Sequence, residues 1–255
     1  MARRALKDPP ICRLDWRNFH RLIPSRFSES GTVLSSIAEN PEELADLVLL
    51  DGATNDRVQS EERGFIGIST FELVYGIPSA HVVNAAYTHP NESGSRFNDY
   101  TRGAWYAADC QQASIAEVVY HKSRRLSDII VPEEPGRRPA RDVSTYDDWL
   151  ADFTAEFHVL ESAEEFSECL QPEPVPECYA ASQALARRLL DNGSNGVAYP
   201  SVRYQGVRYR GAQCIACFRP ALVYNPHRSE RLEISLRASD EGYDRSVRRV
   251  PAPGQ

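Results

Sequence analysis

Residues 94–121, GSRFNDYTRGAWYAADCQQASIAEVVYH, restrict the fold more than any other stretch of the chain. GAWYAA predicts a short apolar strand, and the sequence from about Asp109 onward has the apolar spacing of a helix whose last turn is cationic. A strand that leads almost directly into a helix brings the strand end and the helix start together. Functional residues often lie at such junctions, so this stretch is the first candidate for a site.

Glu117 interrupts the apolar pattern of the predicted helix. On a helical wheel one broad arc is apolar, and it holds Ile115, Ala116, Val118, Val119 and Tyr120. Glu117 shares the remaining polar sector with Ser114 and His121. Its carboxylate is therefore either an ordinary solvated group or, where it meets Arg96 and Tyr106 at the strand–helix junction, the acid of an active site.

Two distant segments can supply partners for such a site. HRLIP, residues 20–24, contains Arg21, and YPSVR, residues 199–203, places Ser201 in a strand that its proline marks as terminal or edge. Without a role in a site, the arginines would simply be exposed and Ser201 would be a structural residue. No GxSxG elbow surrounds Ser201, which argues against a nucleophilic serine. Neither a GxxxxGK[ST] nor a GxGxxG motif occurs, so the sequence gives no sign of a P-loop or Rossmann site.

The rest of the chain mixes helices and strands without regular alternation. Helices are predicted at about 41–50 and 177–191, and strands within 65–89 and in the segments GVAYPSVRY and CIACFRPALVYN, separated by a turn around residues 206–211. This order predicts an α+β fold, a mixed domain with a split and largely antiparallel sheet, and disfavours a doubly wound parallel sheet.

A single domain over residues 1–255 is expected, with a core at about 17–225. Prolines and acidic residues dominate 127–176, where apolar residues are widely spaced, which predicts an insertion or lid with one or two short helices. A second insertion is expected at about 35–64, and residues 226–255 are interpreted as a charged tail.

Composition excludes several classes of function. The formal net charge of −7 argues against binding to a nucleic-acid backbone, so no nucleic-acid partner is expected. Apolar clusters such as LADLVLL are too short to span a bilayer, and the start MARRALKDPP lacks the apolar region of a signal peptide. A cytoplasmic location without membrane contact is therefore predicted.

The six cysteines are scattered through a chain that, with 42% hydrophobic residues, can form a core without disulfides. Reduced thiols are expected. Cys214 and Cys217 form the one CxxC motif, but it lies in an apolar run typical of a strand, where positions three apart point to opposite faces. No structural metal is predicted there.

Three segments, in order and in context, resemble the RES domain, the toxin of bacterial RES–Xre toxin–antitoxin pairs. FHRLIPSRF resembles the family's aromatic–arginine start, and GSRFNDYTRGAWYAADCQQASIAEVVYH resembles its central Gly–Arg–aromatic–Asn turn, Tyr–Ala strand and Ala–Glu–Val helix. SQALARRLLDNGSNGVAYPSVRYQG is similar to the family's helix, Gly turn and Tyr–Pro–Ser strand. The resemblance implies a fold similar to ADP-ribosyltransferase toxins and an enzyme that takes NAD⁺ as substrate without any further cofactor.

The resemblance also implies roles for five residues. Arg96 and Arg21 would hold the phosphates of the dinucleotide, because a guanidinium offers paired donors to pyrophosphate oxygens. Tyr106 would stack near the nicotinamide, and Ser201 would position ribose or nicotinamide by a hydrogen bond. Glu117 would orient the ribose hydroxyls and stabilise the oxocarbenium character of the transition state.

The function so implied is an NAD⁺ glycohydrolase or phosphorolase. The alternatives are an ADP-ribosyltransferase that modifies a protein or small acceptor, and a RES-like protein that binds a nucleotide or partner without turnover. The resemblance implies an Xre-type antitoxin as partner, and the sequence leaves self-association open. Two departures, the long stretch between Arg21 and Arg96 and the enlarged segment 127–176, indicate a larger variant in which the added segments are expected to cover the site or bind another domain.

Overall fold

A seven-stranded sheet connects most of the residues that the computed structural model describes, which are 7–28, 67–129, 141–160, 164–204, 211–240 and 242–251. Its strands are β1 (Ile11–Pro24), β2 (Trp105–Ala108), β3 (Arg141–Val159), β4 (Gly196–Pro200), β5 (Gln213–Cys217), β6 (Tyr224–Ser239) and β7 (Gly242–Val250). The helices are α1 (Ser25–Ser28), α4 (Ala80–Thr88), α5 (Gln111–Asp128) and α6 (Ala180–Asp191), with short 3₁₀ turns η2 (Thr70–Glu72), η3 (Ser167–Cys169), η4 (Glu177–Tyr179) and η5 (Pro220–Leu222).

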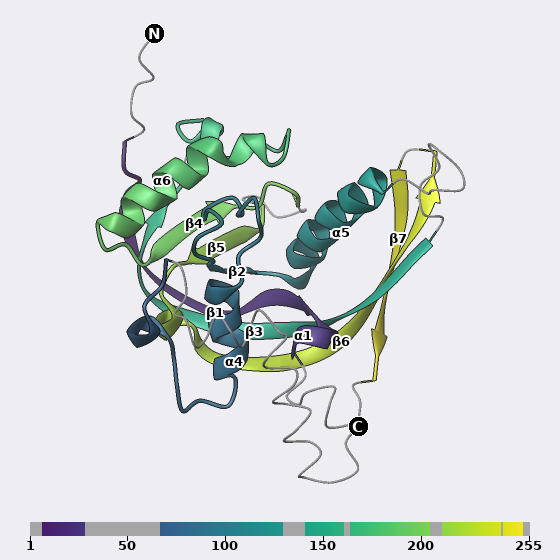
Figure 1. The fold of residues 1–255 in the computed structure, drawn as a ribbon, viewed down its shortest axis with the longest axis horizontal. Coiled ribbons are helices and arrows are strands. Elements are labelled where there is room, and N and C mark those ends of the chain that lie inside the picture. Colours follow the sequence, from purple (N-terminus) through teal and green to yellow (C-terminus); the bar gives the residue numbers. More distant parts are fainter. Residues whose placement is uncertain are drawn as a thin grey trace, which may run out of the picture.

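The strand order is β1-β2-β5-β4-β3-β6-β7, and β1 also pairs with β3. The first five strands therefore close on themselves, while β6 and β7 extend the sheet beyond β3 (Figure 1). Every pairing is antiparallel except the short parallel contact between β3 and β4. The predicted α+β class with a largely antiparallel sheet is confirmed.

Several predicted elements are confirmed. The strand in GAWYAA is β2, the helix that follows it is α5, the helix at 177–191 is η4 followed by α6, and the two later strands are β4 and β5. The predicted helix at 41–50 and residues 206–210 of the predicted turn lie outside the described residues. The single-domain boundaries stay a prediction.

The interpretation of 127–176 as an insertion with short helices is wrong for residues 141–159, which form β3, the longest strand. β3 pairs with β1, β4 and β6. Its acidic residues are compatible with a central strand because they have partners there: Asp147 receives two hydrogen bonds from Arg231, at 2.7 and 2.9 Å. Arg231 belongs to β6, so most of the predicted charged tail, residues 226–239 and 242–250, is also sheet.

Residues 65–89 were predicted to be strands, and where described they are not. Ser69 caps η2 with a reciprocal capping box, and α4 follows at Ala80–Thr88. The β-branched pair Val82 and Val83 is buried on α4, in the same core cluster as Trp105. Burial on a tertiary face has here outweighed the β-propensity of the sequence.

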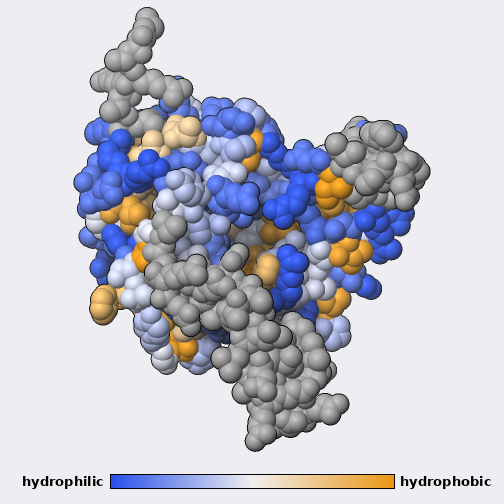
Figure 2. All heavy atoms as spheres, viewed as in Figure 1, coloured by the Kyte–Doolittle hydropathy of each residue, from blue (hydrophilic) through white to orange (hydrophobic). Residues whose placement is uncertain are grey.

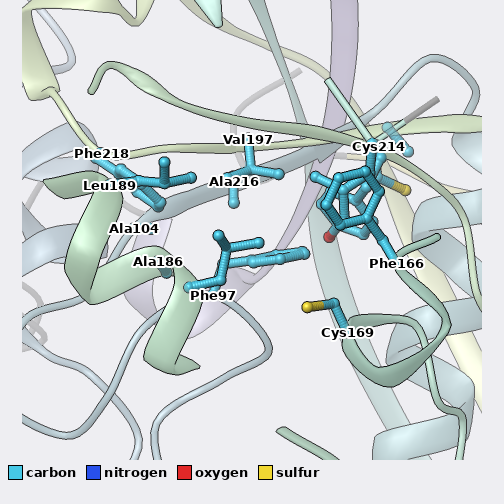
Figure 3. Close-up of a cluster of buried hydrophobic side chains, with 14 of the residues drawn as sticks. Phe97, Ala104, Phe166, Cys169, Ala186, Leu189, Val197, Cys214, Ala216 and Phe218 are labelled. Carbon is cyan, nitrogen blue, oxygen red and sulfur yellow. The ribbon is translucent and has the colours of Figure 1, made fainter. Parts of the chain in front are cut away.

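Three core clusters support the sheet. The first joins α6 to β2, β4 and β5 and includes Phe97, Leu189 and Cys214 (Figure 3). The second packs α4 against the sheet and includes Cys217, and the third lies between α5 and the long strands β3 and β6. Cys214 and Cys217 thus belong to different clusters, as expected for positions three apart in a strand.

The surface in Figure 2 is largely hydrophilic, with hydrophobic residues in small separate groups. Within the described ranges, none of the helices combines the length and apolar character that crossing a bilayer requires.

Candidate active site

Glu117 lies on α5 near groups that are buried in the first core cluster. Its side chain is 32% exposed and one carboxylate oxygen is 3.6 Å from His121 Nε2. Burial raises the pKa of three groups, and the negative charge of Glu117 raises it further; these are Tyr179, Tyr199 and Cys214. The carboxylate is therefore not a purely solvated helix residue, because buried groups from three other elements sense its charge.

Ser201 directly follows β4 and lies beside the same thiol. The backbone N–H of Tyr204 donates to Ser201 Oγ at 3.1 Å. Burial raises the pKa of Cys214, and a hydrogen bond between Ser201 and the thiol opposes part of that rise. Cys214 thus interacts with both the serine and the glutamate.

Arg96 is held by a tight loop before β2. Gly94 has φ +68°, and a Cβ there would lie 2.2 Å from the carbonyl oxygen of Asn98, so the loop requires glycine. The Arg96 side chain is buried, and its Nη1 donates to the carbonyl oxygens of Cys169 at 3.0 Å and Gln171 at 2.9 Å. Its charge is thus satisfied by neutral acceptors.

Tyr106 fixes that loop from β2. Its hydroxyl donates to Asn98 Oδ1 at 2.7 Å and accepts a hydrogen bond from the N–H of Phe97 at 2.9 Å. Burial raises the pKa of the phenol, so it remains protonated. The hydroxyl of Tyr106 is fully used within the protein, which leaves only its ring for contact with a ligand.

Arg21 reaches the same strand from β1. Its Nη1 donates to the carbonyl oxygen of Tyr106 at 3.3 Å, and its guanidinium lies 4.8 Å from the ring centre of Trp105. Burial lowers the pKa of Arg21 to about 10, so it is still charged at neutral pH. Within the described residues Arg21 has no ion pair with an acid, and its Nε is buried without a partner. A buried cation without a carboxylate favours an anionic ligand.

Four of these residues, Tyr106 among them, are linked through a group of three tyrosines, and Ser201 is linked to Glu117 through Cys214. Arg96 acts on the pKa of Tyr106, Tyr179 and Tyr199; Arg21 acts on that of Tyr106; and Glu117 acts on the other two. The structure therefore brings the predicted residues of β1, β2, α5 and the end of β4 into one region. Figure 1 shows β2, β4 and β5 between α5 and α6 in this view.

Sequence reasoning did not identify Tyr179, nor the polar network that joins Gln111, the first residue of α5, to β3 and β1. In that network Asp148 is fully buried and contacts His20 Nδ1 at 2.8 Å and Gln111 Nε2 at 2.7 Å. The only sequence signal for Asp148 was the acidic composition that suggested a loop. Tyr179 carried no signal beyond its place in a helical apolar stripe.

Two surface cavities lie next to this region. One, of about 420 Å³, is lined by Tyr120, Ser123, Arg124, Ser127, Glu173, Gly242 and Tyr243. The other, of about 250 Å³, lies beside the loop that carries Arg102. The five predicted residues line neither cavity, and the donors of Arg96 are covered by the segment that contains Cys169 and Gln171.

The match to a protein-family model agrees with the resemblance seen in the sequence. The RES domain matches residues 73–237. No curated protein matches the chain. Among solved structures, the chain is similar to the M. tuberculosis MbcT–MbcA toxin–antitoxin complex, with 13% sequence identity, 58% of this chain and 73% of that chain covered, and a TM-score of 0.37. Because the RES match covers more than half of the 255 residues, the chain belongs to the RES domain family.

Proposed function

We propose that this protein cleaves the bond between nicotinamide and ribose in NAD⁺, as a glycohydrolase or a phosphorolase. One observation carries the proposal: a partly exposed carboxylate, Glu117, lies in the same region as two arginines that have no acidic partner among the described residues. A carboxylate suits the cationic ribose, and unpaired guanidinium groups suit the two phosphates.

The bond cleavage needs little proton transfer. Nicotinamide in NAD⁺ is a cationic leaving group that departs as a neutral molecule with the bonding electrons, so no general acid is required. The ribose carbon becomes an oxocarbenium ion, which the negative charge of Glu117 would stabilise. Water then adds at this carbon and loses a proton to give ADP-ribose, or inorganic phosphate adds to give the ribosyl phosphate.

Binding would be divided among the other residues. Arg21 and Arg96 would bind the diphosphate, since a guanidinium can donate two parallel hydrogen bonds to phosphate oxygens. Ser201 would hold a ribose hydroxyl or the nicotinamide amide. The ring of Tyr106 would provide a stacking surface, since its hydroxyl is occupied by Phe97 and Asn98.

The proposed partner is an Xre-type antitoxin, which follows from membership of the RES family. Its binding would restrain a reaction that depletes a central cofactor of the cell.

Nicotinamide release from NAD⁺ by the purified protein tests the function. Glu117→Gln keeps size and removes charge, and should lower kcat by about 10²–10³-fold. Glu156→Gln, an exposed glutamate on β3, is the matched control and should keep full activity. The proposal is wrong if the folded wild-type protein binds ADP-ribose but releases no nicotinamide, or if Glu117→Gln is as active as the control.

Product analysis identifies the acceptor. Free ADP-ribose indicates water, a phosphorylated ribose indicates phosphate, and a labelled protein indicates ADP-ribosyl transfer. All three share the first step, so Glu117→Gln should reduce each of them.

A further inference from the structure

Residues 169–176, CLQPEPVP, run from the last residue of η3 to the start of η4 and cover the buried Arg96; they are here called the strap. Cys169 is fully buried in the first core cluster and anchors one end (Figure 3). Residues 171–174 and 176 are exposed, and Val175 is only partly buried. Little apolar surface therefore holds the middle of the strap in place.

Arginine side chains hold the strap through its backbone carbonyl oxygens. Arg96 donates to the carbonyls of Cys169 and Gln171, at 3.0 and 2.9 Å. Arg203 Nη2 donates to the carbonyl of Pro172 at 2.6 Å, and Arg124 Nη2 donates to that of Val175. Three guanidinium groups thus converge on one segment of eight residues, most of them exposed.

The charges in this contact are poorly matched. The only acidic side chain of the strap is Glu173, which lies 3.6 Å from Arg124 and contacts the Tyr120 hydroxyl. Its side chain is 54% exposed, so the pair is well screened by water. The hydrogen bonds of Arg96 and Arg203 to the strap go to neutral carbonyl oxygens, while Glu173 interacts with Arg203 only through its screened charge. Phosphate oxygens are charged acceptors, and they form shorter and stronger hydrogen bonds with guanidinium groups.

Arg203 occupies a position suited to a ligand. It lies two residues after Ser201, and its guanidinium is 3.4 Å from the ring centre of Tyr120, which is on the same helix as Glu117. Its Nε is buried and has no partner within the described part of the chain. Arg203 therefore carries unused donor capacity between the two proposed catalytic elements.

We propose that the strap covers a diphosphate-binding position formed by Arg96 and Arg203, and that it leaves these arginines when a dinucleotide binds. The carbonyl oxygens of Cys169, Gln171 and Pro172 occupy the donors that phosphate oxygens would take. The strap is then an inhibitory cover, and Arg203 is an additional ligand-binding residue. This inference rests on the proposed function for the identity of the ligand.

Binding of inorganic pyrophosphate and of ADP-ribose, measured by calorimetry, tests the competition without any need for turnover. Replacing Pro172, Pro174 and Pro176 by glycine leaves the arginines intact and increases the freedom of the open strap. This variant should bind both probes about 3- to 10-fold more tightly, because closing the looser strap costs more entropy. Pro78→Gly, at an exposed proline outside the site, is the control and should bind them as wild type does.

Arg203→Gln should weaken binding of pyrophosphate and ADP-ribose by about tenfold, and Arg203→Lys should restore part of the loss. Partial rescue by lysine separates a ligand contact from a folding defect. Hydrogen exchange gives a direct readout of opening: the N–H of Cys178 donates to the carbonyl of Pro174 at 2.7 Å, so its exchange should rise when ADP-ribose binds.

Equal affinities of wild type and the triple-glycine variant would overturn the strap as a competitor. Unchanged binding by Arg203→Gln would remove Arg203 from the site. These outcomes are independent of the proposed function. If the protein binds the probes as described but releases no nicotinamide, the strap proposal stands and the proposed activity is wrong. If the protein releases nicotinamide but no variant changes the probe affinities, the proposed activity stands and the strap proposal is wrong.

Discussion

Arg96 and Arg102 lie six residues apart, and the structure uses them in opposite ways. Both are buried, with exposed fractions of 6% and 7%. Arg102 forms two parallel hydrogen bonds to the carboxylate of Glu72, each at 2.9 Å, and a third to the carbonyl of Phe218. Among the described residues Arg96 has no acidic partner, and its hydrogen bonds go to the carbonyls of Cys169 and Gln171.

The difference separates an arginine that stabilises the fold from one that can bind a ligand. A buried guanidinium with a bidentate carboxylate is neutralised, so an incoming anion would gain little from it. A guanidinium with carbonyl acceptors keeps its full charge. Of the two, only Arg96 is therefore suited to a diphosphate.

Breaking the Arg102 pair should have the largest effect on stability. Arg102→Ala leaves Glu72 with Arg219 alone and is expected to lower the free energy of unfolding by about 3 kcal/mol, less than for a fully buried pair because Glu72 is 30% exposed. Urea unfolding of wild type and Arg102→Ala measures this loss. A loss below about 1 kcal/mol would contradict the structural role of this arginine.

Arg96→Gln should have a smaller effect on stability and a larger one on ligand affinity. It removes the charge but keeps a donor for the strap carbonyls, so the free energy of unfolding should fall by about 1 kcal/mol. Binding of ADP-ribose should weaken at least tenfold, as measured by calorimetry. Unchanged affinity would place the diphosphate elsewhere.

The pH dependence of stability should identify Glu72. Its hydrogen bonds from Arg102 are the main cause that lowers its pKa from 4.5 to about 2. The carboxylate therefore stabilises the fold fully above pH 4.5, and this contribution is lost as the pH falls from 4.5 through 2. Glu72→Gln should flatten the stability profile in that range, while a profile identical to wild type would show that the pair contributes nothing.

An exposed arginine should give the smallest effect on the free energy of unfolding. Arg187 lies 2.6 Å from Asp99, but its side chain is 63% exposed. Arg187→Ala should change the free energy of unfolding by less than about 1 kcal/mol. A loss as large as that of Arg102→Ala would mean that burial does not distinguish these pairs.

Local patterns in the sequence were sufficient for β2, α5, α6, β4 and β5, because each has the periodicity of its type. They failed for β3, since its acidic residues are tolerated only through partners such as Arg231, 84 residues away. They failed for α4 because burial of Val82 and Val83 in the second core cluster is a tertiary effect.

The candidate site shows the same division. The motif resemblance supplied Arg21, Arg96, Tyr106, Glu117 and Ser201, which the structure places in one region. It did not show that the hydroxyl of Tyr106 is occupied, or that Arg96 and Arg203 bind a strap. The strap contacts join segments more than 30 residues apart, which a local pattern does not encode. The partners of the Tyr106 hydroxyl are only eight and nine residues away, but the hydrogen bonds depend on how the loop before β2 folds back on the strand.

Steady-state nicotinamide release from NAD⁺ by wild type, Glu117→Gln and Arg96→Gln tests the central claim most directly. A carboxylate that acts in the transition state should appear in kcat, and an arginine that binds the diphosphate should appear mainly in KM. The account predicts a kcat lowered about 10²–10³-fold for Glu117→Gln and a KM raised at least tenfold for Arg96→Gln. Release by both folded variants with wild-type kcat and KM would contradict it.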